Sequence, residues 1–429
     1  MKITPIPPGT KDVLPAEAAE LRHLRQSIRD VFDSFGYGEV ITPTLETEAA
    51  LETAGEKRFR NSFRLFDERG EVLVLRPEMT TPIARVVATR MADREPPIRL
   101  CYFAGAFSPI SPQRGRQSEF RQAGLELIGL GEPAVDAEVL AVLCRALDAC
   151  GLVDYSVGLG EASFFRALLE SAGVSGESRD EIFAALVERD MVRLSAAVAS
   201  LDAAADDKTA IMDVIALRGG SEVLRRAQDL VRGPRMEAAL KRLARTYYLV
   251  SRYGLADRIL FDLGMFRNFD YYTGIVFEVY SGDLGFPIGG GGRYDGLLAR
   301  FGRPAPAVGF AIGLDRLHIA VTGQGGVRAA VRPSVALIGG LEPELDLANQ
   351  LRDSGVAVYA LPAGIDEAAA LALAADAGSM WLAVPAGGSD FRLIRLPARA
   401  QAEPGTPGGA GGRLGPVLKR EDLVRELTA

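Results

Sequence analysis

The sequence predicts an α+β fold, in which a mixed, largely antiparallel sheet is flanked by helices and followed by a small α/β domain. Strands with glycine-rich and polar faces occur before and after a helical stretch rich in Ala, Leu and Arg, at about residues 171–253. From Pro333 onward, strands and helices alternate, as in a domain with parallel strands. We therefore expect a first domain at 1–322 that contains a helical insertion, a linker at 323–332, and a second domain at 333–429.

The composition is that of a soluble globular protein, with 48% hydrophobic and 24% charged residues over 429 positions. The net charge of −7 gives no general support for binding to polyanions. The segment from Pro333 onward is acidic as well, with eight basic against twelve acidic residues. The N-terminus lacks the apolar core of a signal peptide, and no apolar run is long enough to span a membrane. We expect a cytoplasmic protein.

The three cysteines and two histidines do not have the spacing of metal ligands. Cys101, Cys144 and Cys150 are expected to be buried free thiols, which are common in protein interiors. His23 lies off the apolar stripe of its predicted helix and is expected to be solvated. No metal and no cofactor are expected.

The N-terminal region is predicted to combine helices with short strands. Apolar residues recur at helical spacing over 21–35. A strand at 71–75 is followed by Glu78, and a helix begins near Thr80. Glu78 therefore lies where a strand ends and a helix begins, which is a common position for ligand contacts. An acid near a helix N-terminus also has a purely stabilising role through the helix dipole, and both interpretations stay open.

A strand at 120–127 has two unlike faces. Side chains alternate along a strand, so that Gln122, Gly124 and Glu126 share one side while mainly apolar residues occupy the other. A buried amide and a buried carboxylate need partners, and the glycine between them lets a ligand approach the backbone. We interpret this face as a ligand floor. The alternative is a solvated polar face with a bulge glycine.

Small residues also share strand faces in the later part of the first domain, after the helical stretch. A glycine run occurs at 289–292, and Gly309, Ala311 and Gly313 share one face of a later strand. Three small residues on one face leave room for a flat ligand or for a tightly packed element. Arg316, in the first turn of the following helix, can reach over such a space.

Six motifs resemble those of histidyl-tRNA synthetases and their relatives, and they occur in the same order. They are GTKDVLP at 9–15, LRPEMT at 75–80, GRQSEFRQAGLELIG at 115–129, RNFDYYTGIVFE at 267–278, GGGGRYDGL at 289–297 and GFAIGLDRL at 309–317. The resemblance implies a class II aminoacyl-tRNA synthetase-like antiparallel sheet flanked by helices, and a homodimeric core. It also implies that the second domain resembles an anticodon-binding domain, here one with few basic residues.

The resemblance further implies a pocket for free histidine. The residues that match the amino-acid pocket of those synthetases are Glu78, Thr80, Gln122, Glu126, Arg267, Tyr271 and Tyr272. Their chemistry suits histidine, since Glu126 or Glu78 can accept from the imidazole N–H or the α-ammonium group, and Gln122 can bind the polar end. The sequence leaves open which acid meets which group.

The nucleotide side departs from the synthetase pattern. Synthetases carry an arginine and a glutamate where this chain has Ser108 and Ile110. Serine cannot neutralise a phosphate and isoleucine cannot accept a hydrogen bond from adenine, so adenylate formation loses its main electrostatic support. Arg116 and Arg316 remain as candidates for a residual nucleotide or anion contact.

A chain that keeps the histidine pocket and lacks the activation residues resembles the regulatory subunits of ATP phosphoribosyltransferase. This resemblance implies a non-catalytic subunit that binds L-histidine as an effector and joins a short-form catalytic subunit in a hetero-oligomer, in the first step of histidine biosynthesis. Feedback control then acts through a coupling free energy between the two sites. No membrane contact and no tRNA binding are expected.

Two alternatives remain at this point. One is an active histidyl-tRNA synthetase with an atypical ATP-binding loop. The other is a synthetase-like enzyme that adenylates another amino acid or a protein, although it needs the same nucleotide-binding groups.

Overall fold

The computed structural model describes residues 6–55, 62–109, 117–265, 272–282, 284–326, 334–340, 342–396 and 413–428. The chain divides into two compact units, Met1–Val327 and Arg328–Ala429, each with its own apolar core. Within the described ranges, no helix is both long and apolar enough to cross a membrane.

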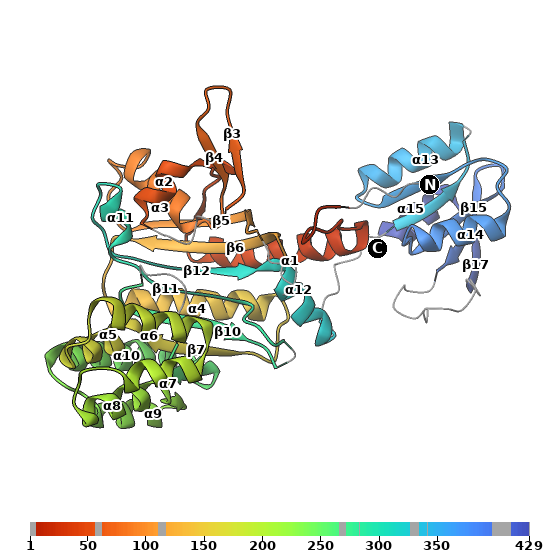
Figure 1. Ribbon diagram of the computed structural model, residues 1–429. Coiled ribbons are helices and arrows are strands. Elements are labelled where there is room, and N and C mark those ends of the chain that lie inside the picture. Colours follow the sequence, from red (N-terminus) through yellow and green to blue (C-terminus); the bar gives the residue numbers. More distant parts are fainter. Residues whose placement is uncertain are drawn as a thin grey trace. The chain divides into compact units, whose positions relative to one another are not determined.

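A mixed sheet forms the centre of the first unit and has nine strands among the described residues (Figure 1). In spatial order they are β1 (Gly38–Glu39), β5 (Ile98–Phe107), β6 (Glu119–Ile128), β12 (Ala307–Gly313), β11 (Gly289–Arg293), β10 (Ile275–Tyr280), β7 (Ser156–Glu161), β9 (Ile259–Asp262) and β8 (Arg218–Gly219). Neighbouring strands are antiparallel from β5 to β7, whereas β1 pairs with β5, and β7 with β9, in parallel. The predicted α+β class with a largely antiparallel sheet is confirmed.

The two faces of this sheet have different coverings, because β6 alternates apolar with small or polar residues. The helices of this unit outside the insertion are α1 (Pro15–Ser34), α2 (Glu48–Thr53), α3 (Thr80–Thr89), α4 (Pro133–Ala149), α11 (Leu297–Arg300) and α12 (Leu314–Gly323). Ala123, Leu125 and Leu127 are fully buried in the largest core, to which α1 and α4 contribute their apolar stripes. On the opposite face, α3 and α11 contribute Ile83 and Leu297 to a second core. Gln122, Gly124 and Glu126 belong to this second face.

A small sheet stands out from the body of the unit near α2 and α3 (Figure 1). Its strands, in spatial order, are β2 (Leu45–Thr47), β4 (Val72–Leu75) and β3 (Arg64–Phe66). The antiparallel pairs Leu45–Leu75 and Leu65–Leu73 place four leucines on one face, because Leu73 and Leu75 are two residues apart. Leu45 and Leu65 are exposed, whereas Val74 on the other face is buried.

Helices between β7 and β9 form an insertion that packs beside α4 (Figure 1). They are α5 (Ala162–Ser171), α6 (Gly176–Glu188), α7 (Met191–Ala199), α8 (Ala205–Ile215), α9 (Glu222–Asp229), α10 (Pro234–Arg252) and the 3₁₀ turn η3 (Ala256–Arg258). The helix α10 begins with a proline and packs against both α4 and α5. Its apolar stripe joins the largest core, so the insertion is packed against the sheet region through this helix.

The second unit is an α/β domain with a mixed sheet. Its strands, in spatial order, are β14 (Ala357–Leu361), β13 (Ser334–Ile338), β15 (Trp381–Gly387), β16 (Asp390–Arg395) and β17 (Arg413–Lys419), and its helices are α13 (Glu342–Asp353), α14 (Glu367–Asp376) and α15 (Arg420–Thr428). The strands β14, β13 and β15 are parallel. The strands β16 and β17 are antiparallel additions, and Gly387 and Gly388 adopt positive φ angles that allow a tight reversal from β15 into β16.

Candidate functional site

The site is built on the second face of the large sheet, where three neighbouring strands present small or polar residues. The β6–β12 register places Glu126 opposite Gly309, Gly124 opposite Ala311 and Gln122 opposite Gly313. On β11, Gly292 lies opposite Gly309 in turn. These pairings continue one face across the three strands, as the alternation in the sequence predicts.

Two glycines of this face are needed because neighbouring side chains occupy the space that a Cβ atom would take. A Cβ atom on Gly309 would lie 1.8 Å from Oε2 of Glu126, and a Cβ atom on Gly124 would lie 2.4 Å from the hydroxyl oxygen of Tyr102. Both glycines therefore make room for the buried side chains of the neighbouring strands. For Gly309, where the sequence allowed either a flat ligand or a tightly packed element, the structure shows the packed element.

The carboxylate of Glu126 is held by two hydroxyl groups. Its side chain is 1% exposed, Oε1 accepts a hydrogen bond from Oγ1 of Thr80 at 3.0 Å, and Oε2 accepts one from the hydroxyl of Tyr294. Burial raises the pKa of Glu126 to about 8, although the hydrogen bonds from Tyr294 and Thr80 lower it and the charge of Glu78 raises it. The carboxyl group is thus poised to change its charge near neutral pH.

Glu78 lies two residues before the helix α3 and its side chain binds the N-terminus of that helix. Its Oε2 accepts from the backbone N–H of Thr80 at 2.5 Å and its Oε1 from that of Thr81 at 2.8 Å, so both oxygens satisfy donors at the helix N-terminus. The stabilising role that the sequence left open is therefore present. Thr80 links the two acids, because its N–H donates to Glu78 and its hydroxyl to Glu126.

Gln122 has an unusual environment for an amide. Its Oε1 is buried and has no hydrogen-bond partner among the described residues. A buried acceptor without a partner costs free energy, so this oxygen can accept a hydrogen bond from a ligand or from a water molecule. Tyr272 is also buried, and a Cβ atom on Gly292 would lie 2.7 Å from its ring, so this ring lies against β11 on the same side as the floor.

The remaining predicted residues are placed as follows. Arg267, Tyr271, Arg116 and Ile110 lie outside the described residues. Arg316 is exposed at the start of α12, and its side chain passes 3.5 Å from a Cβ position on Gly313, beside the Gln122 end of the floor. It donates to the carbonyl of Pro287 at 2.7 Å and stacks on Phe286 at 4.9 Å from the ring centroid.

On the nucleotide side, Ser108 is exposed beyond the end of β5. Its backbone N–H donates to the carbonyl of Ser118 at 2.8 Å. Ser118 in turn donates its N–H to Gly9 and its hydroxyl to Pro8, so the N-terminal segment is attached to the strand that carries the floor.

Sequence reasoning missed Tyr294 as a residue of this site. It follows β11 directly, and residues 290, 292 and 294 alternate onto the face that carries Glu126. The signal was therefore in the glycine-run motif, because a tyrosine two residues after Gly292 continues the same face.

Comparison with known proteins gives the class to which this fold and site belong. Residues 9–317 match the family profile described as histidyl-tRNA synthetase. This chain therefore belongs to the histidyl-tRNA synthetase family, with the class II synthetase-like fold that the motifs predicted.

Relatives within that family are more specific. The chain is 42% identical to the ATP phosphoribosyltransferase regulatory subunit of Desulforamulus reducens over 316 residues, which is 73% of this chain and 78% of the relative. It is 38% identical to that of Symbiobacterium thermophilum over 402 residues, 93% of this chain and 94% of the relative. A crystal structure from Bacillus halodurans, titled an ATP phosphoribosyltransferase regulatory subunit/histidyl-tRNA synthetase, is similar with a TM-score of 0.78 at 32% identity, covering 88% of this chain and 97% of that one. Within the synthetase family, this chain belongs with the ATP phosphoribosyltransferase regulatory subunits, which are components of histidine biosynthesis.

Proposed function

We propose that this chain binds free histidine on the floor of β6 and thereby controls the activity of an ATP phosphoribosyltransferase catalytic subunit. The observation that carries the proposal is the buried acceptor Oε1 of Gln122, which has no partner among the described residues and shares a strand face with the buried Glu126. A ligand with several N–H donors satisfies both acceptors, and histidine offers an ammonium group and an imidazole N–H.

The state of Glu126 supports a cationic donor as its partner. After accepting from Thr80 and Tyr294, each carboxylate oxygen keeps a further lone pair. An opposite charge close to a buried carboxyl group favours ionisation, and the interaction is strong where the dielectric is low. Glu78 and Glu126 each accept two hydrogen bonds, and Glu126 is the better candidate for the charged group of histidine because it shares a strand face with Gln122.

Aminoacylation and tRNA binding are not part of the proposed function. The position that carries an arginine in synthetases is the neutral Ser108, which cannot neutralise a phosphate. Arg316 is engaged by Pro287 and Phe286, and these contacts hold its guanidinium at the edge of the floor.

The proposed assembly is a hetero-oligomer around a homodimeric core. The name of the relatives implies a catalytic partner, and histidine bound here shifts the complex toward its less active state. For the homodimer, the leucine face of the small sheet (exposed Leu45 and Leu65 with half-buried Leu73 and Leu75) supports a contact with a second copy, because contiguous apolar surface marks association sites. The free buried cysteines fit a cytoplasmic location, where thiols stay reduced.

The proposal is tested by combining the purified chain with its short catalytic subunit and measuring phosphoribosyltransferase activity with and without histidine. We expect the chain to support activity and histidine to inhibit it. Glu126→Ala should remove inhibition while activity is retained, and Glu119→Ala, at the exposed start of the same strand, is the matched control. Inhibition that persists in Glu126→Ala contradicts the proposal, and strong histidine-dependent ATP–pyrophosphate exchange by the chain alone favours a synthetase instead.

A further inference from the structure

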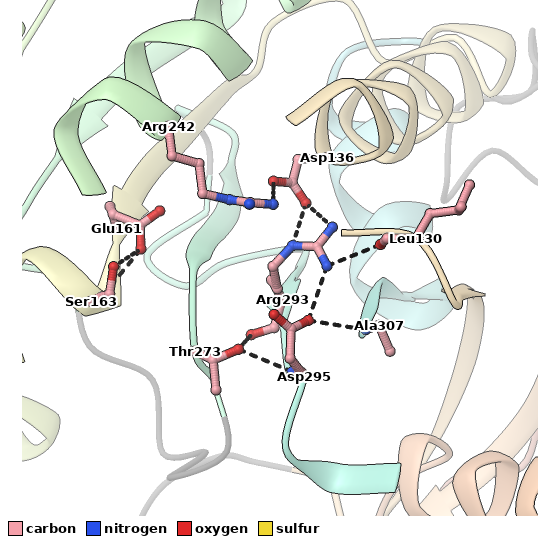
Figure 2. A network of polar contacts seen from close by, with 9 residues as sticks. All are labelled: Leu130, Asp136, Glu161, Ser163, Arg242, Thr273, Arg293, Asp295 and Ala307. Atoms are coloured by element: carbon pink, nitrogen blue, oxygen red, sulfur yellow. Dashed lines mark hydrogen bonds and ion pairs between the residues drawn. The ribbon is translucent and has the colours of Figure 1, made fainter. Parts of the chain in front are cut away.

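A buried ion network lies behind the pocket, between α4, β11 and the helical insertion (Figure 2). Asp136, in the first turn of α4, is fully buried, and its Oδ1 accepts from Nε and Nη2 of Arg293 at 2.8 and 2.5 Å. Its Oδ2 accepts from Nη2 of Arg242 on α10 at 2.5 Å. One carboxylate therefore joins the sheet to the insertion.

The contacts of Asp136 with Arg293 and Arg242 restrict the relative positions of β11, α4 and α10. Arg293 is 1% exposed and engages Asp136 through two nitrogens. Burial lowers the pKa of Arg293, but the charges and hydrogen bonds of Asp136 and Asp295 together raise it above its usual value, so the side chain stays charged. A buried charge that loses its partner is costly, so the network tolerates few arrangements.

At its other end, Arg293 is clamped to the segment that leads into β10. Its carbonyl accepts from the N–H of Thr273 at 2.7 Å, and its Nη1 donates to Oδ1 of Asp295 at 3.0 Å. The N–H of Asp295 donates back to Oγ1 of Thr273 at 3.0 Å. A Cβ atom on Gly274 would lie 3.0 Å from Cδ of Arg293, so the packing leaves little slack.

The hydrogen bonds among Thr273, Arg293 and Asp295 fix the positions of two neighbouring tyrosines of the pocket. Tyr272 precedes Thr273, and Tyr294 lies between Arg293 and Asp295. Adjacent side chains on an extended segment point to opposite sides, which is why Arg293 reaches Asp136 while Tyr294 reaches Glu126. Because the two residues are neighbours in the chain, a shift of the Arg293 backbone also shifts Tyr294 and changes the geometry of its hydrogen bond to Glu126.

At the insertion end, Arg242 has a second acid available. Glu161, which ends β7, is buried and interacts electrostatically with Arg242. Its Oε1 accepts from the hydroxyl of Ser163 at 2.6 Å, whereas its Oε2 has no hydrogen-bond partner among the described residues, and neither has Nε of Arg242. Figure 2 shows Glu161 and Asp136 on two sides of the Arg242 side chain. A small movement of α10 can thus change how Arg242 divides its charge between the two acids.

We propose that Arg242, Asp136 and Arg293 form a relay through which the position of the helical insertion sets the position of Tyr294 and Tyr272 in the histidine pocket. These three are positioning residues, since none of them belongs to the pocket face. The relay rests on the proposed histidine site and deepens it. A partner that displaces α10 changes histidine affinity, and by reciprocity histidine changes the affinity for that partner.

The test compares Arg242→Met with Arg235→Met in the full-length chain. Arg235 is on the same helix and pairs with Glu170, but it is 79% exposed at its side chain and has no contact with the relay. Histidine affinity, measured by calorimetry, should fall about tenfold in Arg242→Met, as is typical for coupling through packed networks, and stay unchanged in Arg235→Met. Arg242→Lys should recover part of the loss, because it restores the charge.

A double variant distinguishes an effect of Arg242 on the pocket tyrosines from a general loss of stability. In a Tyr294→Phe background, Arg242→Met should cause a smaller loss of affinity than in the wild type, because part of its effect acts through Tyr294, whereas fully additive losses would overturn the relay. Hydrogen exchange gives a readout without histidine. Residues 272–282 and 284–297 should exchange faster in Arg242→Met than in Arg235→Met.

The two proposals can fail separately. Wild-type protein that does not bind histidine refutes the proposed function, and the relay is then judged by hydrogen exchange alone. Wild-type binding with equal affinity and equal exchange in both arginine variants refutes the relay.

Discussion

The hydroxyl of Tyr294 donates a hydrogen bond to the buried carboxylate of Glu126, a residue 168 positions earlier in the chain. With Thr80 donating to the other oxygen, the carboxylate is oriented by two side chains from different elements, α3 and the end of β11. Such orientation lowers the ordering cost when a ligand binds, because the acceptor is already held in one position.

Replacing this tyrosine tests that arrangement. Tyr294→Phe removes one hydrogen bond to a charged group and should weaken histidine binding by about 1.5–3 kcal/mol, which is at least tenfold in affinity. Calorimetric titration measures the change. Tyr359→Phe, at an exposed tyrosine of the second unit, is the control and should bind as the wild type does. Unchanged affinity in Tyr294→Phe would show that the Glu126 carboxylate does not contact the ligand in this orientation.

Gln122→Met should change stability and binding in opposite directions. Methionine is similar in length and removes the buried Oε1 that has no partner among the described residues, so the free energy of unfolding should rise by about 1 kcal/mol. Histidine binding should be lost, because the ligand no longer finds this acceptor. Urea denaturation and calorimetry on the same preparation measure both effects. A variant that is stabilised and still binds histidine normally would place the ligand elsewhere.

The stability of the ligand-free protein should depend on pH through Glu126. Its pKa of about 8 in the folded state lies above the value of 4.5 expected without burial, so the folded state binds the proton more tightly. The contribution of Glu126 to stability is therefore fully present below about pH 4.5 and is lost as the pH rises to about 8.

The Glu126→Gln variant removes this dependence. Relative to wild type, its free energy of unfolding should increase between pH 5 and pH 8 by an amount on the order of a few kcal/mol, since each tenfold change in proton affinity corresponds to about 1.4 kcal/mol. Denaturant unfolding at several pH values provides the measurement, with Glu119→Gln as the control for loss of an exposed acid. Parallel pH profiles for wild type and Glu126→Gln would contradict a raised pKa.

The leucine face of the small sheet should determine the oligomeric state. Leu65→Asp places a charge on the leucine face and should convert the proposed dimer to a monomer, because an unpaired charge buried at an interface is costly. Light scattering with size-exclusion chromatography measures the mass. Val417→Asp, at an exposed apolar residue of the second unit, should leave the mass unchanged. A dimer that survives Leu65→Asp would assign the contact to another surface.

Local patterns predicted the part of the site that a single strand carries. The alternation along 120–127 correctly separated the face of Gln122, Gly124 and Glu126 from the buried apolar face, because the two-residue period of a strand is a local property. The same period could have identified Tyr294 from the glycine-run motif. The alternation of helices and strands after Pro333 likewise predicted the parallel part of the second sheet, whereas the antiparallel strand β16 follows a glycine turn.

The sequence by itself therefore determined the α+β class, the order of the motifs and the residues that share one face of β6. Only the tertiary structure decided which polar atoms have partners: Glu78 with the start of α3, Glu126 with Thr80 and Tyr294, and Arg242 with Asp136. The physical reason is the distance along the chain between the interacting residues. Alternation and capping depend on neighbours a few residues away, whereas a hydrogen bond between side chains more than a hundred residues apart depends on which strands pair and which helix packs behind them.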